Sequence, residues 1–109
     1  IYFMDILAET IWKSATAVEG YNPDVWRKDF AGAWIRRDQY GLSSKLGWVI
    51  DHIKPKSMGG NDSLENLQAL HWRNNQSKGN SYEDVKTCIT SDGENNIYQL
   101  KKWKLNIKK

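Results

Sequence analysis

The chain has 109 residues, which suits one domain, because natural domains are most often about 100 to 150 residues long. A formal charge of +3 and a pI near 9.0 mildly favour a polyanionic partner. The one cysteine, Cys88, excludes a disulfide within these residues and a cysteine-rich zinc site, and it suits a reducing, cytoplasmic location. No apolar run is long enough to span a bilayer, so we expect no membrane partner.

The first third of the sequence predicts short elements. Apolar residues recur at helical spacing and predict a helix over 5–12; they are Ile6, Leu7, Ile11 and Trp12. A turn signal then precedes a second predicted short helix at 25–27, capped by Asn22 or Asp24. Residues 33–37 predict a short strand.

The middle of the chain alternates between polar loops and an apolar strand. Residues 38–47 are polar with two glycines and predict a loop, which leads into an apolar strand at 48–50. This strand is expected to end at Asp51 and His52. Pro55 is excluded from a central strand, and turn formers follow it, so 55–65 predict an ordered loop.

The remaining elements are a strand, a helix and a hairpin. Residues 67–71 alternate as a strand does, and 72–78 lack Gly and Pro and are followed by Gly79, a natural helix stop. Residues 85–90 and 95–105 flank a Gly-containing turn and predict a β-hairpin. We expect packing to depend on the hairpin and on three tryptophans: Trp34, Trp48 and Trp72.

Chemistry concentrates at the end of the apolar strand, where Asp51 and His52 are adjacent. In extended chain, neighbouring side chains point to opposite faces, so joint action at one ion requires a bend at this pair. Phosphodiester hydrolysis needs an activated water and neutralisation of the charge that develops on the phosphate. Histidine suits the first task near neutral pH. A hard cation such as Mg²⁺ suits the second and takes oxygen ligands, for which Asp51 and Asn75 would suffice.

The segment from Gly47 to Asn80 resembles the HNH nuclease family over about a third of the chain. The resemblance rests on the Asp-His pair, the Pro after Ile-Lys, the Gly-Gly loop, Asn-Leu-Gln before the second strand, and Asn-x-x-Lys-Gly at the helix end. Upstream, YNPDVWRKDFAGAWIRRDQYG resembles the leader of small bacterial and phage members. A bacterial or phage origin is therefore expected.

The resemblance implies an α+β protein with a small ββα-metal (His-Me finger) core at about 47–80. An N-terminal helical and strand extension and a C-terminal β-hairpin would complete a single domain over 1–109. One divalent ion, Mg²⁺ or Mn²⁺, is the implied cofactor, and cleavage of DNA is the implied activity.

Residue by residue, the resemblance assigns His52 as general base and Asp51 as the metal-binding acid. Asn66 matches the central Asn, whose side chain usually braces the loop and orients the base. The third family position falls at Asn75, making this a His-Asn-Asn variant with Asn75 as second protein ligand. Neighbours on a helix lie about 100° apart, so only one of Asn74 and Asn75 faces the ion, and register favours Asn75.

One departure from the family concerns zinc. Many members carry a zinc-binding Cys pair, whose places here hold His71 and Asn74, so no structural zinc is expected. His71 is then a packed or hydrogen-bonded residue in preference to a third ligand. Lys78 lies three residues past Asn75, on the same helical face, and is expected to contact the scissile or a neighbouring phosphate in a catalytic role.

Basic side chains outside the motif are candidates for the flanking phosphates, which supply most non-specific affinity for nucleic acid. They are Arg36, Arg37, Arg73, Lys101, Lys102 and Lys104. Trp103, among the lysines, is either a stacking platform for a base or a half-buried hairpin residue, and the second reading is favoured.

Four functions remain open. A DNA endonuclease is favoured over a related RNA-acting nuclease only through the family resemblance, because nothing in the sequence reads a 2′-hydroxyl. A non-catalytic nucleic-acid-binding module of the same fold is the third, and a plain structural domain is the fourth. Because both members of the Asp-His pair are present, we favour catalysis. A weak homodimer is left open.

Overall fold

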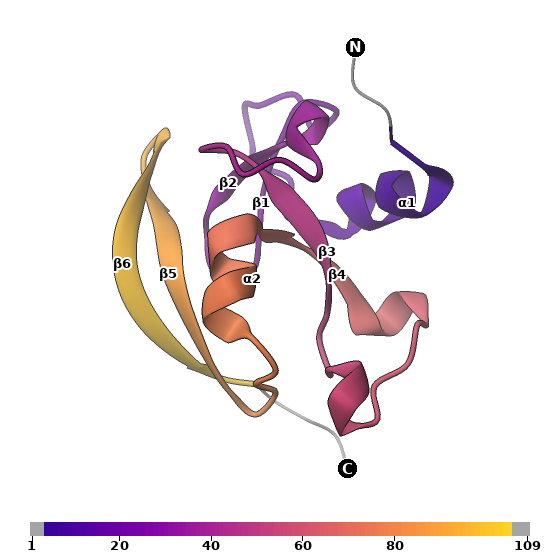
Figure 1. The fold of residues 1–109 in the computed structure, drawn as a ribbon. Helices are drawn as coiled ribbons and strands as arrows, with labels where there is room; N and C mark the ends of the chain where they lie inside the picture. Colours follow the sequence, from indigo (N-terminus) through magenta and orange to yellow (C-terminus); the bar gives the residue numbers. More distant parts are fainter. Residues whose placement is uncertain (1–3, 106–109) are drawn as a thin grey trace.

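A computed structural model describes residues 4–105 and has an α+β fold (Figure 1). In the described residues, the strands pair as three antiparallel two-stranded sheets, β1–β2, β3–β4 and β5–β6. The elements are α1 (Ile6–Ser14), β1 (Trp26–Lys28), β2 (Trp34–Arg36), β3 (Trp48–His52), β4 (Leu67–His71), α2 (Trp72–Lys78), β5 (Asp84–Asp92) and β6 (Asn95–Lys104). No helix among these residues is long and apolar enough to cross a membrane.

Helix α1 confirms the predicted N-terminal helix but buries a different face. Asp5 caps the helix by accepting a hydrogen bond from the Ala8 N–H at 2.7 Å. The buried stripe is Ala8, Ile11 and Trp12, at i, i+3 and i+4. Ile6 and Leu7 were part of the predicted apolar pattern, yet they are exposed, because the helix packs against β4 through one side only.

The predicted helix at 25–27 is wrong, because these residues enter β1. The Asn22 carbonyl accepts bonds from Val25 and Trp26, which makes one turn only. From Trp26 the chain pairs with β2 in the register Trp26↔Arg36. Pairing and an edge contact between the Trp26 and Trp34 rings outweigh the local helical preference. The strand predicted at 33–37 is β2.

The predicted strand and helix at 67–71 and 72–78 are confirmed with the same bounds as β4 and α2. Strand β3 ends at His52, as expected, because Asp51 and His52 still pair with Gln68 and Leu67. The bend expected at the Asp-His pair is wrong, because the chain leaves the strand only after His52. The bend is not required, since both residues line one cleft at the end of the strand.

A buried carboxylate, Asp29, joins two parts of the fold that are distant in the sequence. Asp29 is 3% exposed, and its Oδ1 accepts hydrogen bonds from the Ala31 and Ala33 N–H groups. Its Oδ2 accepts bonds from the His71 N–H and the Asn74 amide, both at 3.0 Å. Desolvation raises the pKa of Asp29, although these donors oppose the shift. The β1–β2 turn is thereby tied to the junction of β4 and α2.

The main core lies between α1 and the β3–β4 sheet, with Trp12 and Trp48 in ring contact at its centre. Trp34 is also buried, as expected, whereas Trp72 is half-buried. The β5–β6 hairpin is confirmed, and Figure 1 shows it curving around one side of α2. Trp103 is half-buried and donates to the Thr87 hydroxyl at 2.8 Å, which agrees with the favoured interpretation.

His71 makes the stability of this junction depend on pH. The side chain is buried, its Nδ1 accepts from the Arg73 N–H, and its Nε2 lies 2.9 Å from the Lys45 carbonyl. An accepting Nδ1 requires the neutral ring with the proton on Nε2. Burial accordingly lowers the pKa of His71. The unfolded chain then binds the proton more readily, so stability is lost as the pH falls below about 6.5.

We expect the free energy of unfolding to fall between about pH 7.5 and 5.5, as measured by urea denaturation. In His71→Asn, an amide oxygen still caps α2 but cannot be protonated in this range, so the pH dependence should be smaller. Asp29 is present in both proteins, so its own titration largely cancels in the comparison. Equal pH dependence in the two proteins would contradict the assigned neutral ring.

Candidate active site

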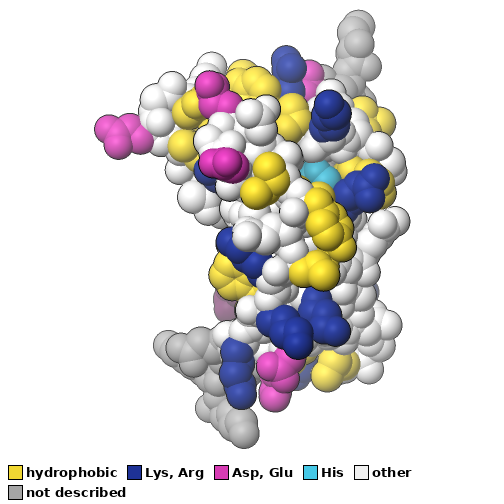
Figure 2. Space-filling model, turned by 90° about the vertical axis from the view of Figure 1, so that its left-hand side faces the viewer, with side chains coloured by type: hydrophobic (Ala, Val, Ile, Leu, Met, Phe, Trp, Pro, Cys, Tyr) yellow, Lys and Arg dark blue, Asp and Glu magenta, His cyan; other side chains and the backbone are white. Residues whose placement is uncertain are grey.

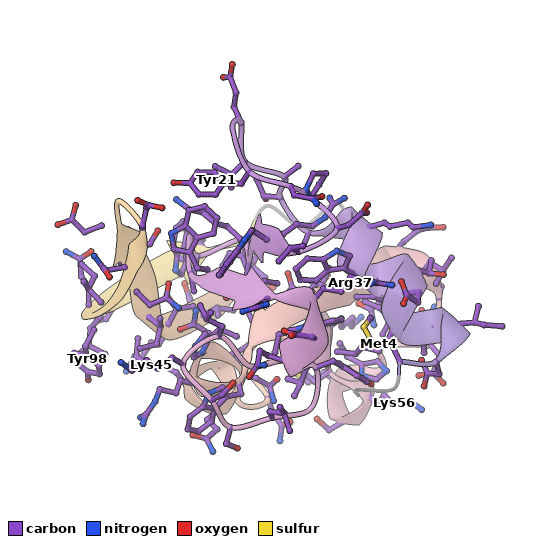
Figure 3. All side chains as sticks on the ribbon, turned by 90° about the horizontal axis from the view of Figure 1, so that it is seen from above. Met4, Tyr21, Arg37, Lys45, Lys56 and Tyr98 are labelled. Carbon is purple, nitrogen blue, oxygen red and sulfur yellow. The ribbon has the colours of Figure 1, made fainter. Side chains whose placement is uncertain are left out.

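A cleft of about 390 Å³ opens where β3 ends beside the C-terminal end of α2. It collects Asp51 and His52 from β3 and Asn75 from α2, three residues that the sequence predicted to act together. The other residues of its wall are Ile50, Pro55, Lys56, Ser57, Gly79 and Asn80. Figure 3 labels Lys56, which lies on the opposite side of the molecule from the hairpin residue Tyr98.

Asp51 is held from two sides beneath the cleft. Its side chain is 6% exposed, Oδ1 lies 3.3 Å from the Lys78 ammonium, and Oδ2 accepts from the Gln68 amide at 3.0 Å. Each carboxylate oxygen has two acceptor positions, so both can accept a further partner. The carboxylate is therefore fixed in orientation and still able to bind a cation.

Lys78 is not on the wall of the cleft, and the predicted phosphate contact has no support from its placement. Its side chain is 1% exposed, and the ammonium also donates to the His52 carbonyl at 2.9 Å. Although Lys78 lies one turn past Asn75, its side chain is buried beneath β3 and does not share the cleft with Asn75. Lys78 joins both members of the Asp-His pair to α2.

His52 lies beside an acid from the following loop. Its Nε2 is 2.7 Å from Asp62 Oδ1, and Asp62 Oδ2 accepts from Lys56 at 3.0 Å. The hydrogen bonds from His52 and Lys56 lower the pKa of Asp62, so this carboxylate is ionised and can only accept. The proton of a neutral His52 ring is therefore on Nε2, which leaves Nδ1 with a free lone pair.

Asn66 fastens the loop that follows His52. Its amide nitrogen donates to the Lys54 and Asn61 carbonyls at 3.0 and 2.8 Å. Its amide oxygen accepts from the Lys54 N–H at 2.8 Å, and its backbone carbonyl accepts from the Ile53 N–H. The side chain does not line the cleft. It holds the backbone from which the His52 and Asp62 pair is presented.

Asn74 and Asn75 face opposite surroundings. Asn74 is fully buried, and its side chain bonds Asp29, the Ile89 carbonyl and two backbone N–H groups of β5. Asn75 is half-buried and lines the cleft. The phase of α2 thus gives Asn74 a packing position and leaves Asn75 beside Asp51 and His52.

Comparison with protein families matches residues 41–81 to the family model described as HNH endonuclease. Residues 41–81 are thus similar to HNH endonucleases. The match contains the whole of β3, β4 and α2, and it indicates nuclease activity in general. No curated protein and no solved structure matches the chain in the corresponding comparisons.

The two asparagines of the HNH segment should respond differently to substitution. Asn74→Ala leaves two N–H groups and a carbonyl of the hairpin side unpaired, so we expect a loss of about 2–4 kcal/mol in the free energy of unfolding. Asn75→Ala should change stability by less than about 1 kcal/mol and weaken Mn²⁺ binding, measured calorimetrically. If Asn74→Ala weakened metal binding while Asn75→Ala did not, the assignment would be reversed.

The predicted nucleic-acid contacts are spread outside the HNH cleft. Arg36 lies over the Trp26 ring and pairs with Asp38, while Arg37 pairs with Glu9. Arg73 is exposed and covers the Trp72 ring. Lys101 is half-buried against Trp103, and Lys102 and Lys104 are exposed on the hairpin. None of these six lines the cleft.

Sequence reasoning missed Asp62 and Gln68, which contact the two residues of the Asp-His pair. Asp62 lies among glycines and asparagines that predict a turn, and nothing in that pattern distinguishes a loop acid that returns to the strand end. Gln68 has a usable signal, because strand residues opposite one another across an antiparallel pair are in contact, and the register places it opposite Asp51.

Proposed function

We propose that this protein is a metal-dependent endonuclease that hydrolyses DNA phosphodiester bonds in the cleft formed by β3 and α2. The observation that carries the proposal is the meeting of Asp51, His52 and Asn75 in one open cleft inside the HNH segment. The strand–loop–strand–helix order of 47–80 supports a ββα-metal core of the His-Asn-Asn type, within a single domain.

The donor set fits one divalent ion. HNH domains generally use a divalent metal, and Asp51 and Asn75 would hold it through a carboxylate and an amide oxygen. No cluster of three or more His, Cys, Asp or Glu exists among residues 4–105. Mg²⁺ and Mn²⁺ fit two protein oxygens, because Mg²⁺ usually keeps several waters. When bound, the ion would neutralise charge on the phosphate and on the leaving oxygen.

His52 supplies the base in this proposal. Nδ1 has the free lone pair, so it accepts a proton from water while the water oxygen forms its bond to phosphorus. The phosphorus–oxygen bond to the leaving nucleoside breaks, and that oxygen takes a proton from solvent. Asp62, 2.7 Å from Nε2, stabilises the imidazolium that forms and keeps the ring in place. Asp62 is thus a positioning residue.

Lys78 and Asn66 support this site without facing the substrate. Lys78 orients the Asp51 carboxylate and the backbone of His52, and Asn66 fixes the loop that carries Asp62. A displacement of about 1 Å at a reacting group lowers rates by about a hundredfold, so such supports affect catalysis without contact to the DNA.

The test is an incubation of supercoiled plasmid with the protein and Mg²⁺, Mn²⁺ or EDTA, with single-stranded RNA in parallel. We expect nicked plasmid in the presence of metal and none in EDTA. Cleavage of RNA without cleavage of DNA would show that the substrate is RNA. Intact DNA and RNA with every metal, combined with a DNA shift on a gel, would favour a binding module of the same fold.

The hairpin offers a route for flanking DNA. Lys86 and Lys102 lie directly opposite each other, an arrangement that is unfavourable in the free protein. They line a groove of about 390 Å³, whose other lining residues are Lys104, Trp103, Val85 and one acid, Asp84. None of the three lysines forms an ion pair with a residue in the described part of the chain. A phosphate between the opposed lysines would relieve their repulsion.

We expect the double variant Lys86→Ala/Lys102→Ala to flatten the plot of log Kd for DNA against log salt by about 1.8, because each lost phosphate contact removes about 0.9. The measurement is fluorescence anisotropy in EDTA at several salt concentrations. Lys13→Ala, which changes an exposed lysine of α1, is the control and should leave the slope unchanged. An unchanged slope in the double variant would place the DNA elsewhere.

A further inference from the structure

A second and larger hollow lies at the other end of α2. It has a volume of about 510 Å³ and lies between the loop at 43–46, the start of α2 and strand β6. Known ligand sites have volumes of about 300–1,000 Å³, so the hollow is large enough for a nucleotide. We refer to it as the hairpin groove. It shares no lining residue with the proposed active site.

The walls of the hairpin groove combine an exposed aromatic ring with cations. Tyr98 is 70% exposed, and its ring makes no contact with another aromatic ring or cation among residues 4–105. Lys45 and Arg73 line the same groove, and neither forms an ion pair with a described residue. Figure 3 places Tyr98 and Lys45 on the same side of the molecule.

The acidic residue and the second large aromatic ring of the groove already have partners within the protein. Glu94, its acidic lining residue, accepts a hydrogen bond from the Tyr21 hydroxyl, which raises the pKa of Tyr21. The Arg73 guanidinium lies 4.6 Å from the centre of the Trp72 ring, and the indole N–H of Trp72 donates to the Ser44 carbonyl. Trp72 is therefore fixed and holds the Arg73 guanidinium in place.

An exposed aromatic ring in the same groove as two cations that have no ion-pair partner among residues 4–105 matches the chemistry of a nucleotide. Bases stack on tyrosine rings and on arginine planes, and phosphates bind lysine and arginine. A base inside a duplex is stacked on its neighbours and cannot reach such a ring, so the matching ligand is an unpaired base. Figure 2 faces the hairpin and shows hydrophobic side chains beside Lys and Arg on this face.

Helix α2 connects the groove to the proposed active site. Trp72 lines the groove, Gly79 lines the cleft, and Asn75 lies between them on the same helical face. Seven residues at a rise of 1.5 Å span about 10 Å. This is the length of the helical connection alone, and Tyr98 lies on the opposite side of the molecule from Lys56 of the cleft (Figure 3).

We propose that the hairpin groove is a subsite for an unpaired nucleotide of the DNA that is cut in the cleft, with the base on Tyr98 and the phosphate beside Lys45 and Arg73. The inference rests on the proposed nuclease function for its choice of ligand. It gives the enzyme a preference for DNA with a single-stranded segment next to the cut.

The test measures binding in EDTA, so that no cleavage occurs. Fluorescein-labelled duplexes, either blunt or with a four-nucleotide unpaired extension, are titrated with wild type, Tyr98→Ala and Arg73→Ala. The control is Leu100→Ala, because Leu100 is 67% exposed on the same strand and lies outside the groove. Unfolding midpoints show that each variant folds.

We expect wild type and Leu100→Ala to bind the extended DNA at least about fivefold more tightly than the blunt duplex, and Tyr98→Ala to lose this preference. Arg73→Ala should weaken it. No preference in wild type, or an equal preference in Tyr98→Ala, would overturn the proposal. So would sedimentation showing a wild-type dimer that Tyr98→Ala dissociates without changing DNA binding, because the groove would then serve self-association.

These outcomes are separate from those of the nuclease proposal. If the binding experiment shows no preference for extended DNA, metal-dependent nicking and its dependence on His52 are unaffected. If the protein is not a nuclease, the plasmid assay shows no nicking, whatever binding preference is measured in EDTA.

Discussion

Replacing His52 with alanine should lower the rate of metal-dependent plasmid nicking by about a hundredfold to ten-thousandfold, the range for loss of a general base. The His52 side chain is 31% exposed, and its ring bonds Asp62 on an exposed loop. The variant should therefore fold, with an unfolding midpoint close to that of wild type. The measurement is the initial rate of nicked-product formation at saturating Mg²⁺.

Two companion measurements isolate the role of the base. His52→Gln keeps a polar side chain without a basic nitrogen, so it should be about as slow as His52→Ala. DNA affinity in EDTA should change little in either variant, because the imidazole accepts a proton and contributes little to binding. A wild-type rate in His52→Ala would show that another group activates the water.

Replacing Lys78 with methionine should reduce the free energy of unfolding by about 3–5 kcal/mol, because it leaves a buried carboxylate without its cation. Methionine has a similar length, so the loss reflects charge more than volume. Asp51 is 6% exposed and retains only the Gln68 amide as a side-chain partner. The measurement is urea denaturation at neutral pH.

The double variant Asp51→Asn/Lys78→Met shows whether the two charges act as a pair. Its destabilisation should be smaller than the sum of the two single effects by about 0.5–3 kcal/mol, since both charges are removed together. A loss below about 1 kcal/mol in Lys78→Met would mean that the ammonium is not needed beneath Asp51, and would return Lys78 to the candidates for phosphate contact.

The sequence was sufficient where local chemistry determines the backbone. Gly79 follows α2 with a positive φ of 54°, and Gly93 lies in the hairpin turn with a positive φ of 59°. A glycine is favoured at both places because other residues rarely adopt positive φ. The bounds of β4 and α2 and the position of the hairpin follow from such signals.

Long-range contacts decided the rest. The turn around Asn22 favours a helix locally, and only the pairing partner, Arg36, makes Trp26 a strand residue. Helical spacing puts Lys78 and Asn75 near one face but does not tell how deep either lies. Asn74 is buried because Asp29 and Ile89, distant in the sequence, supply its partners. Only the assembled fold contains that information.

The central claim is that metal-dependent hydrolysis takes place in the cleft formed by β3 and α2. The most direct test measures the nicking rate as a function of Mn²⁺ concentration for wild type, Asn75→Ala and His52→Ala. We predict no nicking without metal. Asn75→Ala should need a higher Mn²⁺ concentration to reach its maximal nicking rate. His52→Ala should reach its maximal rate at the same Mn²⁺ concentration as wild type, but that rate should be far lower. Nicking that persists in EDTA, or three identical curves, would contradict the claim.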